Sequence, residues 1–159
     1  MLVSNTQTFD SRRTLLTYEI GLVVWRQLGD LVSATTALGL HRLADKQPIT
    51  FVSEIKKRIF NATFICDMGS SLLTGRPPSL NYRFARLQLP ADVSDRVLMR
   101  GGEDLQRALD ALDSNGWNRD GDIYTVTSIR ARTLLAPILN QSLEMFLGDP
   151  QHIDGDAIK

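Results

Sequence analysis

Cys66 and His41 are the first side chains whose types could do chemistry, because a thiol activated by an imidazole is a nucleophile. Cys66 lies in an apolar run between Phe64 and Met68, so we favour a small buried apolar residue over a nucleophile. Asp67 and His41 could form an acid–base pair, but no motif supplies an oxyanion hole or a metal. We therefore expect that the chain is not an enzyme.

Motifs for phosphates and metals are absent from the sequence. It contains no glycine-rich phosphate loop, no HExxH and no nucleophile elbow. A single cysteine excludes an internal disulfide and a cysteine-based zinc site, so we expect no cofactor in this chain. The two histidines, His41 and His152, lie far apart in the sequence.

A basic triplet, Lys56-Lys57-Arg58, follows Glu54 near the start of a predicted helix. The lysines could contact phosphate, but a solvated helix face with Glu54 and Arg58 as an i,i+4 pair is the favoured interpretation. Arg58 could instead bind a carboxylate with both guanidinium nitrogens.

Asp67 is an acid in the middle of an apolar run. A lone buried carboxylate costs several kcal/mol or shifts its pKa until it is neutral, so it needs a partner. Candidates are Arg76, Arg42, His41 and free backbone N–H groups at a helix start. We predict a buried ion pair with Arg76 or Arg42; the alternative is that Asp67 lies on a narrow solvated edge.

The elements that must position these groups are helical. We expect an all-α, irregular bundle of about four to six helices and find no convincing strand. Apolar spacing predicts helices over about 13–39, from 50 or 53 to 75, over 93–112 with a break at Gly101-Gly102, and over 124–147 with a kink at Pro137.

The predicted helix that ends near Gly75 is apolar on nearly all sides, which favours a central position. Gly75 suits a left-handed C-terminal cap, and Pro77-Pro78 prevents continuation. One stripe contains Ile55, Ile59, Ala62, Cys66 and Leu73, and the other contains Phe60, Phe64, Met68 and Leu72.

Length and charge set limits on function. The 159 residues fit one domain, which we expect over 13–147 with flexible tails over 1–12 and 148–159. Acidic and basic residues balance at 18 each, which counts against direct DNA binding. Neither a secretory signal nor an apolar run long enough to span a membrane is visible.

Several short motifs follow one another in order: Ala37-Leu38-Gly39-Leu40-His41-Arg42, Glu54, Lys56-Lys57-Arg58-Ile59-Phe60, Phe64, Asp67 and Gly75-Arg76-Pro77. Together they resemble the middle homology region of fungal zinc-cluster transcription factors, also described as the fungal-specific transcription factor or xylanolytic activator regulatory domain. The clear resemblance covers about 29–90. The signature positions that the resemblance assigns are His41, Arg42, Glu54, Arg58, Asp67, Gly75, Arg76 and Pro77.

Several positions depart from the family pattern. The family tends to be acidic after Gly75-Arg76-Pro77, whereas this sequence has Asn81, Arg83 and Arg86 there. Asn61 stands where an aromatic is usual, and Ser33 and Met68 stand where arginines are common. Two basic partners of the family's usual salt bridges are therefore missing, and Asp67 must find its cation elsewhere.

The resemblance implies a regulatory role in the nucleus, in RNA polymerase II transcription. Such regions lie between a six-cysteine zinc cluster that reads DNA and an activation segment, and they are thought to restrain activation or sense small molecules. DNA contact and zinc would come only from a cluster that this chain lacks. The chain is shorter than the family domain and looks like a fragment, which predicts exposed apolar patches.

Partners implied by the resemblance are other parts of the same factor, a second copy, coregulators and a small-molecule effector, with no membrane. Trp25, Phe60 and Phe64 could line a ligand pocket between helices, although ordinary core is the favoured interpretation. The alternative function is a helical interaction or dimerisation module without a DNA role. An enzyme is a third hypothesis, for which the sequence offers no set of residues.

Overall fold

The computed structural model describes the backbone of residues 4–43 and 49–148, and side chains from Gly21 onward within these ranges. This part of the chain has five α-helices, two short 3-10 helices and no strand, which confirms the all-α prediction. The elements are α1 Ser4–Ala37, η1 Leu40–Arg42, α2 Phe51–Thr74, η2 Tyr82–Phe84, α3 Asp95–Arg100, α4 Gly102–Asp110 and α5 Thr125–Leu147.

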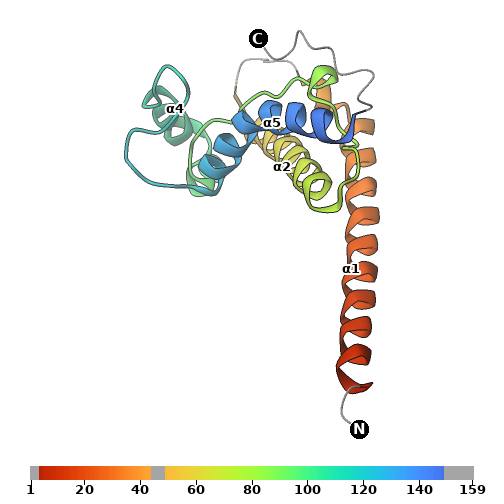
Figure 1. The fold of residues 1–159 in the computed structure, drawn as a ribbon. Helices are drawn as coiled ribbons and strands as arrows, with labels where there is room; N and C mark the ends of the chain where they lie inside the picture. The colour runs from red at the N-terminus through yellow and green to blue at the C-terminus, as the bar shows by residue number, and fades with distance from the viewer. Residues whose placement is uncertain (1–3, 44–48, 149–159) are drawn as a thin grey trace.

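α1 is one long helix that reaches well beyond the rest of the molecule (Figure 1). Its C-terminal part packs against α2, while its N-terminal part projects away from the other helices. The helix begins at Ser4, so residues 4–12, predicted to belong to a flexible tail, form its first turns. Gly39 follows its end in the left-handed region with φ of 70°, and η1 comes next.

α2 lies between α1 and α5 at the centre of the body (Figure 1). Thr50 caps its start, because the Thr50 hydroxyl accepts from the Ser53 N–H at 3.1 Å and the Ser53 hydroxyl accepts from the Thr50 N–H at 2.8 Å. Gly75 caps its end with φ of 64°, a left-handed conformation that favours glycine. Both predicted ends of this helix are confirmed.

The main core is built on one stripe of α2, where Phe60, Phe64 and Met68 are almost fully buried. The rings of Phe60 and Phe64 lie 6.4 Å apart at a tilted angle. Burial of each such side chain contributes about 1.5–3 kcal/mol. Buried residues from the other elements complete this core: Val32, Leu40, Leu80, Ala136 and Leu143.

Three of the five residues on the other predicted stripe of α2 are exposed. Ile59 is 43% exposed, Leu73 is 90% exposed, and Cys66 is exposed as well. The predictions of a helix covered on nearly all sides and of a buried Cys66 are therefore wrong. Only part of the circumference of α2 is covered. Some of the covered positions are occupied by polar side chains.

A smaller second core lies under α3 and α4. Gly101 separates these helices and Gly102 begins α4, with φ of 62° and 55°, which confirms the predicted break. Pro137 lies inside α5, and the kink there stays a prediction. The buried residues of this core are Ala91, Val93, Leu98 and Leu105, with Ile55, Val97, Ala108, Leu109 and Leu112 packed against them.

Two predicted features fall outside the described residues: the tail over 149–159 and most of the predicted loop before α2, residues 44–48. Among the helices of the described ranges, none combines the length and the apolar character that a membrane crossing requires.

Candidate functional site

After Gly75 the chain turns back along α2 as an extended segment, residues 76–94, which we call the strap. η2 is its only helical turn, and α3 follows it (Figure 1). Polar side chains along α2 bind the strap backbone, and the end of α2 pairs with the beginning of the strap while the beginning of α2 pairs with its end. These pairs, which we call the clamp, are Asp67 with Leu80, Asn61 with Gln88, Glu54 with Ala91 and Arg58 with Val93.

Glu54 is fully buried in the first turn of α2. Its Oε2 accepts the Ala91 N–H at 2.6 Å, and its Oε1 lies 3.2 Å from Lys57 Nζ. The predicted pair between Glu54 and Arg58 is wrong, since Lys57 takes that place. The Lys57 side chain is only 12% exposed, so it is not the solvated lysine that we expected.

Arg58 joins α2 to both the strap and α3. Its side chain is almost buried; Nη2 donates to the Val93 carbonyl at 2.8 Å and Nη1 forms an ion pair with Asp95. Arg58 therefore binds a carboxylate, but through one nitrogen, because the other is used by a backbone carbonyl. Asp95 stands in the first turn of α3, where an acid is favoured by the helix dipole.

Asn61, one of the departures from the family pattern, is fully buried. Its Nδ2 donates to the Lys57 carbonyl at 2.7 Å and to the Gln88 carbonyl at 2.8 Å. A phenylalanine at this position could not satisfy the Gln88 carbonyl, because its side chain has no hydrogen-bond donor. The amide therefore serves as a link between α2 and the strap.

Asp67 is buried, as predicted, with 3% exposure. Its Oδ2 accepts the Leu80 N–H at 2.6 Å, and neither Arg76 nor Arg42 forms an ion pair with it. The predicted ion pair is therefore wrong: Arg76 instead lies over the Trp25 ring, 5.0 Å from its centroid. The turn at Gly75 brings a strap N–H to the carboxylate, and such charge-assisted hydrogen bonds are strong.

The remaining signature residues do not gather around Asp67. The His41 carbonyl accepts the Arg86 N–H at 2.9 Å, which ties η1 to the strap, and Arg42 is exposed. Pro77 directly follows Arg76 where the strap begins. The signature is therefore spread along the path of the strap rather than collected into one reactive site.

A second polar cluster joins the strap to α5, and the sequence analysis missed it. Asp92 is 1% exposed; its Oδ1 accepts the Thr127 hydroxyl at 2.6 Å, and its Oδ2 accepts the Asn118 amide Nδ2 at 2.6 Å. Each oxygen thus binds a different segment, and Asp92 holds the loop before α5 against the strap.

Arg130 is the basic member of this cluster, and it is 2% exposed. Its guanidinium donates to the Pro90 carbonyl and, at 2.7 Å, to the Asn115 carbonyl, and it stacks 4.4 Å from the Trp117 ring centroid. Burial lowers the pKa of Arg130, and Asp92 opposes that shift.

A signal for Arg130 does exist in the sequence. The buried positions of α5 recur at intervals of three and four, which is the pattern of a core-facing stripe. A polar residue on such a stripe must be satisfied inside the protein. The stripe contains Val126, Arg130, Thr133, Ala136, Asn140 and Leu143.

A cavity of about 170 Å³ lies between the end of the strap, α3, α4 and the loop before α5. It is lined by Asp92, Val97, Leu112 and Tyr124 among others, and by none of the three predicted wall residues. Pockets for drug-sized ligands have about 300–1,000 Å³, so this cavity is smaller than such pockets.

The Tyr124 hydroxyl, at the edge of this cavity, donates to Asp120 at 2.5 Å, and this bond raises the pKa of Tyr124 to about 12.

The predicted wall residues have other surroundings. Phe60 and Phe64 lie in the main core, whereas Trp25 is 43% exposed beside Arg76. Within the described ranges, no group of three or more acidic, histidine or cysteine side chains could hold a metal ion. What the clamp geometry does is to fix the backbone of the strap.

Fold and clamp together define an all-α scaffold whose buried polar groups hold its own backbone. The family model of the fungal specific transcription factor domain matches residues 13–99, more than half of the 159-residue chain. The chain therefore belongs to this family of transcription-factor regulatory domains, which is not a known enzyme family. All four clamp side chains lie inside the match. No curated protein and no solved structure gives a match.

Proposed function

We propose that this regulatory domain acts in the nucleus on RNA polymerase II transcription, and that it restrains activation through protein contacts. The family match over the clamped part of the chain carries this proposal. DNA contact and zinc would belong to a six-cysteine cluster elsewhere in the factor, because a single cysteine cannot form one here.

Two properties of the structure support contact with protein partners. Glu54, Arg58 and Asp67 use their polar atoms on the strap and on α3, so they shape a surface instead of presenting reactive groups. Large apolar side chains are exposed; Phe84 is 81% exposed and Phe146 is 88% exposed. Exposed apolar groups that form a patch mark interaction sites.

For sensing of a small molecule, the other expected mechanism, the structure offers a cavity that the predicted wall residues do not line. This cavity would admit only a small effector, because its volume is about 170 Å³, and polar side chains such as Asp92 and Asn118 line part of it. We keep this as a second candidate. A set of small polar metabolites that leaves the thermal unfolding temperature unchanged would remove it.

A reporter assay in yeast tests the restraint. The chain is placed between an unrelated DNA-binding domain and an unrelated activation segment, and reporter output is compared with the same fusion lacking the chain. We expect the chain to lower the output several-fold, and the double substitution Glu54→Ala with Arg58→Ala to restore it, since the strap then loses two of its links to α2.

The matched control for this assay is Arg96→Ala, a change at an exposed arginine of α3 outside the clamp. Immunoblots must show equal amounts of each fusion. Equal reporter output with and without the chain would contradict restraint and favour the alternative, a helical interaction or dimerisation module without DNA function.

A further inference from the structure

The strap has an inward and an outward side around η2. Tyr82 and Ala85 pack against the main core, whereas Arg83, Phe84 and Arg86 point away from it and are exposed. Phe84 is 81% exposed, and the Arg83 side chain is 60% exposed. A large aromatic therefore stands between two arginines on the surface.

Two contacts place this segment against its neighbours. The Arg86 N–H donates to the His41 carbonyl at 2.9 Å, which puts Arg86 near the exposed Arg42. Arg83 Nη2 lies 3.2 Å from Glu144 Oε2, which puts η2 beside the end of α5.

Leu147 extends this surface with apolar area. It follows Glu144 by three residues, so it lies on the same side of α5 as the contact with Arg83, and it is 40% exposed. We call this surface the basic face; its residues are Arg42, Arg83, Phe84, Arg86 and Leu147.

Charge is separated along the molecule although the whole chain is neutral. Residues 68–91 contain three arginines and no acid, whereas residues 92–122 contain eight acids and four arginines, a net charge of −4. η2 and α4 lie at different ends of the body (Figure 1). The separated charge would steer an acidic partner to the η2 end.

Arg42 and Arg86 carry the net charge of the basic face. Glu144 offsets the charge of Arg83, while within the described ranges Arg42 and Arg86 form no ion pair. Arginines next to exposed aromatics are the composition of binding hot spots in protein interfaces.

We propose that the basic face binds an acidic amphipathic helical segment of a protein partner. Its carboxylates pair with Arg42 and Arg86, and its apolar residues pack on Phe84 and Leu147. A nucleic-acid backbone fits less well, because such binding depends on many phosphate contacts and would leave both apolar side chains unused. Such a segment would be the partner through which the domain restrains activation. The biological role of this binding therefore rests on the proposed function.

Fluorescence anisotropy tests the binding itself. The probe is a fluorescein-labelled peptide of about four helical turns, with Phe and Leu at i, i+3, i+4 and i+7 and with Asp and Glu at the other positions. We expect saturable binding to the full chain that weakens as salt rises. Arg42→Glu with Arg86→Glu should weaken it about tenfold or more, because like charges then face each other.

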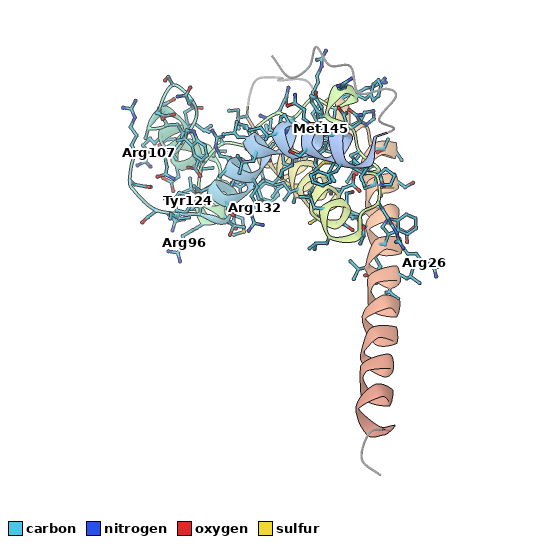
Figure 2. All side chains as sticks on the ribbon, viewed as in Figure 1. Arg26, Arg96, Arg107, Tyr124, Arg132 and Met145 are labelled. Atoms are coloured by element: carbon cyan, nitrogen blue, oxygen red, sulfur yellow. The ribbon has the colours of Figure 1, made fainter. Side chains whose placement is uncertain are left out.

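The charge-matched control is Arg96→Glu with Arg132→Glu. Both arginines are exposed, one on α3 and one on α5, and in the view of Figure 2 both lie toward the α4 end of the body. We expect this control to bind the peptide like the unchanged chain. An equal loss in both double variants would mean that only net charge matters, which would overturn the proposal.

The apolar part of the proposal has its own control. Phe84→Ala should weaken binding several-fold at every salt concentration, while circular dichroism stays unchanged because the ring is exposed. A peptide with Ala at all apolar positions should bind weakly, and equal binding would overturn the amphipathic requirement. A DNA duplex that binds as tightly as the peptide, with the same dependence on Arg42 and Arg86, would overturn the choice of a protein partner.

The two proposals can fail separately. Peptide binding without any effect in the yeast reporter would contradict restraint of activation and leave the basic face intact. Restraint in the reporter that persists unchanged in the Arg42→Glu, Arg86→Glu variant, together with no peptide binding, would contradict the basic face alone.

Discussion

The two cores of this molecule are held in different ways. The main core around α2 is apolar and contains two aromatic rings in tilted contact, Phe60 and Phe64, with helices on either side. The smaller core under α3 and α4 has no aromatic residue among its buried members. Its position relative to the main core depends on polar links through Arg58, Asp92 and Arg130.

This difference means that the global stability and the position of the α3–α4 part depend on different interactions. Apolar burial is non-directional and supplies most of the folding free energy, so the main core should set the global stability. Hydrogen bonds are directional, so the polar links should set where the α3–α4 part sits. The family match ends at residue 99 in α3, and the partners Arg130 and Trp117 lie beyond it.

The largest expected effect is in the main core. Phe64→Ala should lower the free energy of unfolding by about 3–5 kcal/mol, because it removes a fully buried ring and leaves a cavity. Urea denaturation followed by circular dichroism measures it. Phe84→Ala, the same substitution at an 81% exposed ring, should change stability by about 0.5 kcal/mol or less. Equal losses would mean that the main core does not dominate.

Arg130→Ala should show that the smaller core can loosen alone. Two backbone carbonyls, of Pro90 and Asn115, lose their donor, and an unsatisfied buried acceptor costs about 1–3 kcal/mol. Hydrogen exchange should become faster in α3 and α4 while α2 stays protected. Arg132→Ala, at an exposed site on α5, is the control. Equal loss of protection in α2 would show that both cores unfold as one unit.

A smaller effect is expected for the pair of Arg58 and Asp95. The Asp95 side chain is 63% exposed, so the coupling in a double-mutant cycle should be about 0.2–1 kcal/mol. Arg58→Ala alone should cost more than Asp95→Ala alone, because it also leaves the Val93 carbonyl without its donor. If Asp95→Ala lowered the stability more than Arg58→Ala, the ion pair with Asp95 would contribute more than the hydrogen bond from Arg58 to the strap.

The smallest effect is a pH dependence in the loop before α5. Asp113 accepts the Trp117 N–H at 2.8 Å, and this bond, with smaller contributions from Asn115 and nearby arginines, holds the Asp113 pKa below 3.8. The resulting stabilisation is present above pH 3.8 and is lost as the pH falls through the lower folded value.

Trp117 fluorescence reports this transition once Trp25→Phe has removed the other tryptophan. Its emission should shift to the red in acid with a midpoint below pH 3.8, and Asp113→Asn should abolish that shift. An unchanged shift in Asp113→Asn would assign the acid transition to another group.

Local features of the chain were predictable because their causes lie within a few residues. Thr50 and Ser53 cap the start of α2, Gly75 caps its end, and Gly101 breaks the helix between α3 and α4. Each of these depends on a side chain bonding to the nearest backbone or on a φ that glycine adopts freely. The start of α1 was placed too late, because the polar residues 4–12 continue the helix.

The partners of the candidate site residues were predicted less well. The burial of Asp67 followed from its apolar surroundings, but its partner is the Leu80 N–H rather than Arg76 or Arg42. The negative charge of Asp67 suggested an arginine as its partner. The path of the strap instead places the Leu80 N–H within hydrogen-bond distance of the carboxylate. Cys66 was expected inside and lies outside, since apolar residues on both stripes of α2 look alike in the sequence.

By itself, the sequence determined the all-α class, the ends of α2, the break at Gly101 and the family to which the chain belongs. These depend on local backbone preferences, on helical periodicity and on the order of short motifs. Only the tertiary structure decided which face of α2 is buried and that Arg58 reaches Asp95, 37 residues away. Such choices depend on where distant segments pass, because a side chain binds the nearest suitable group in space.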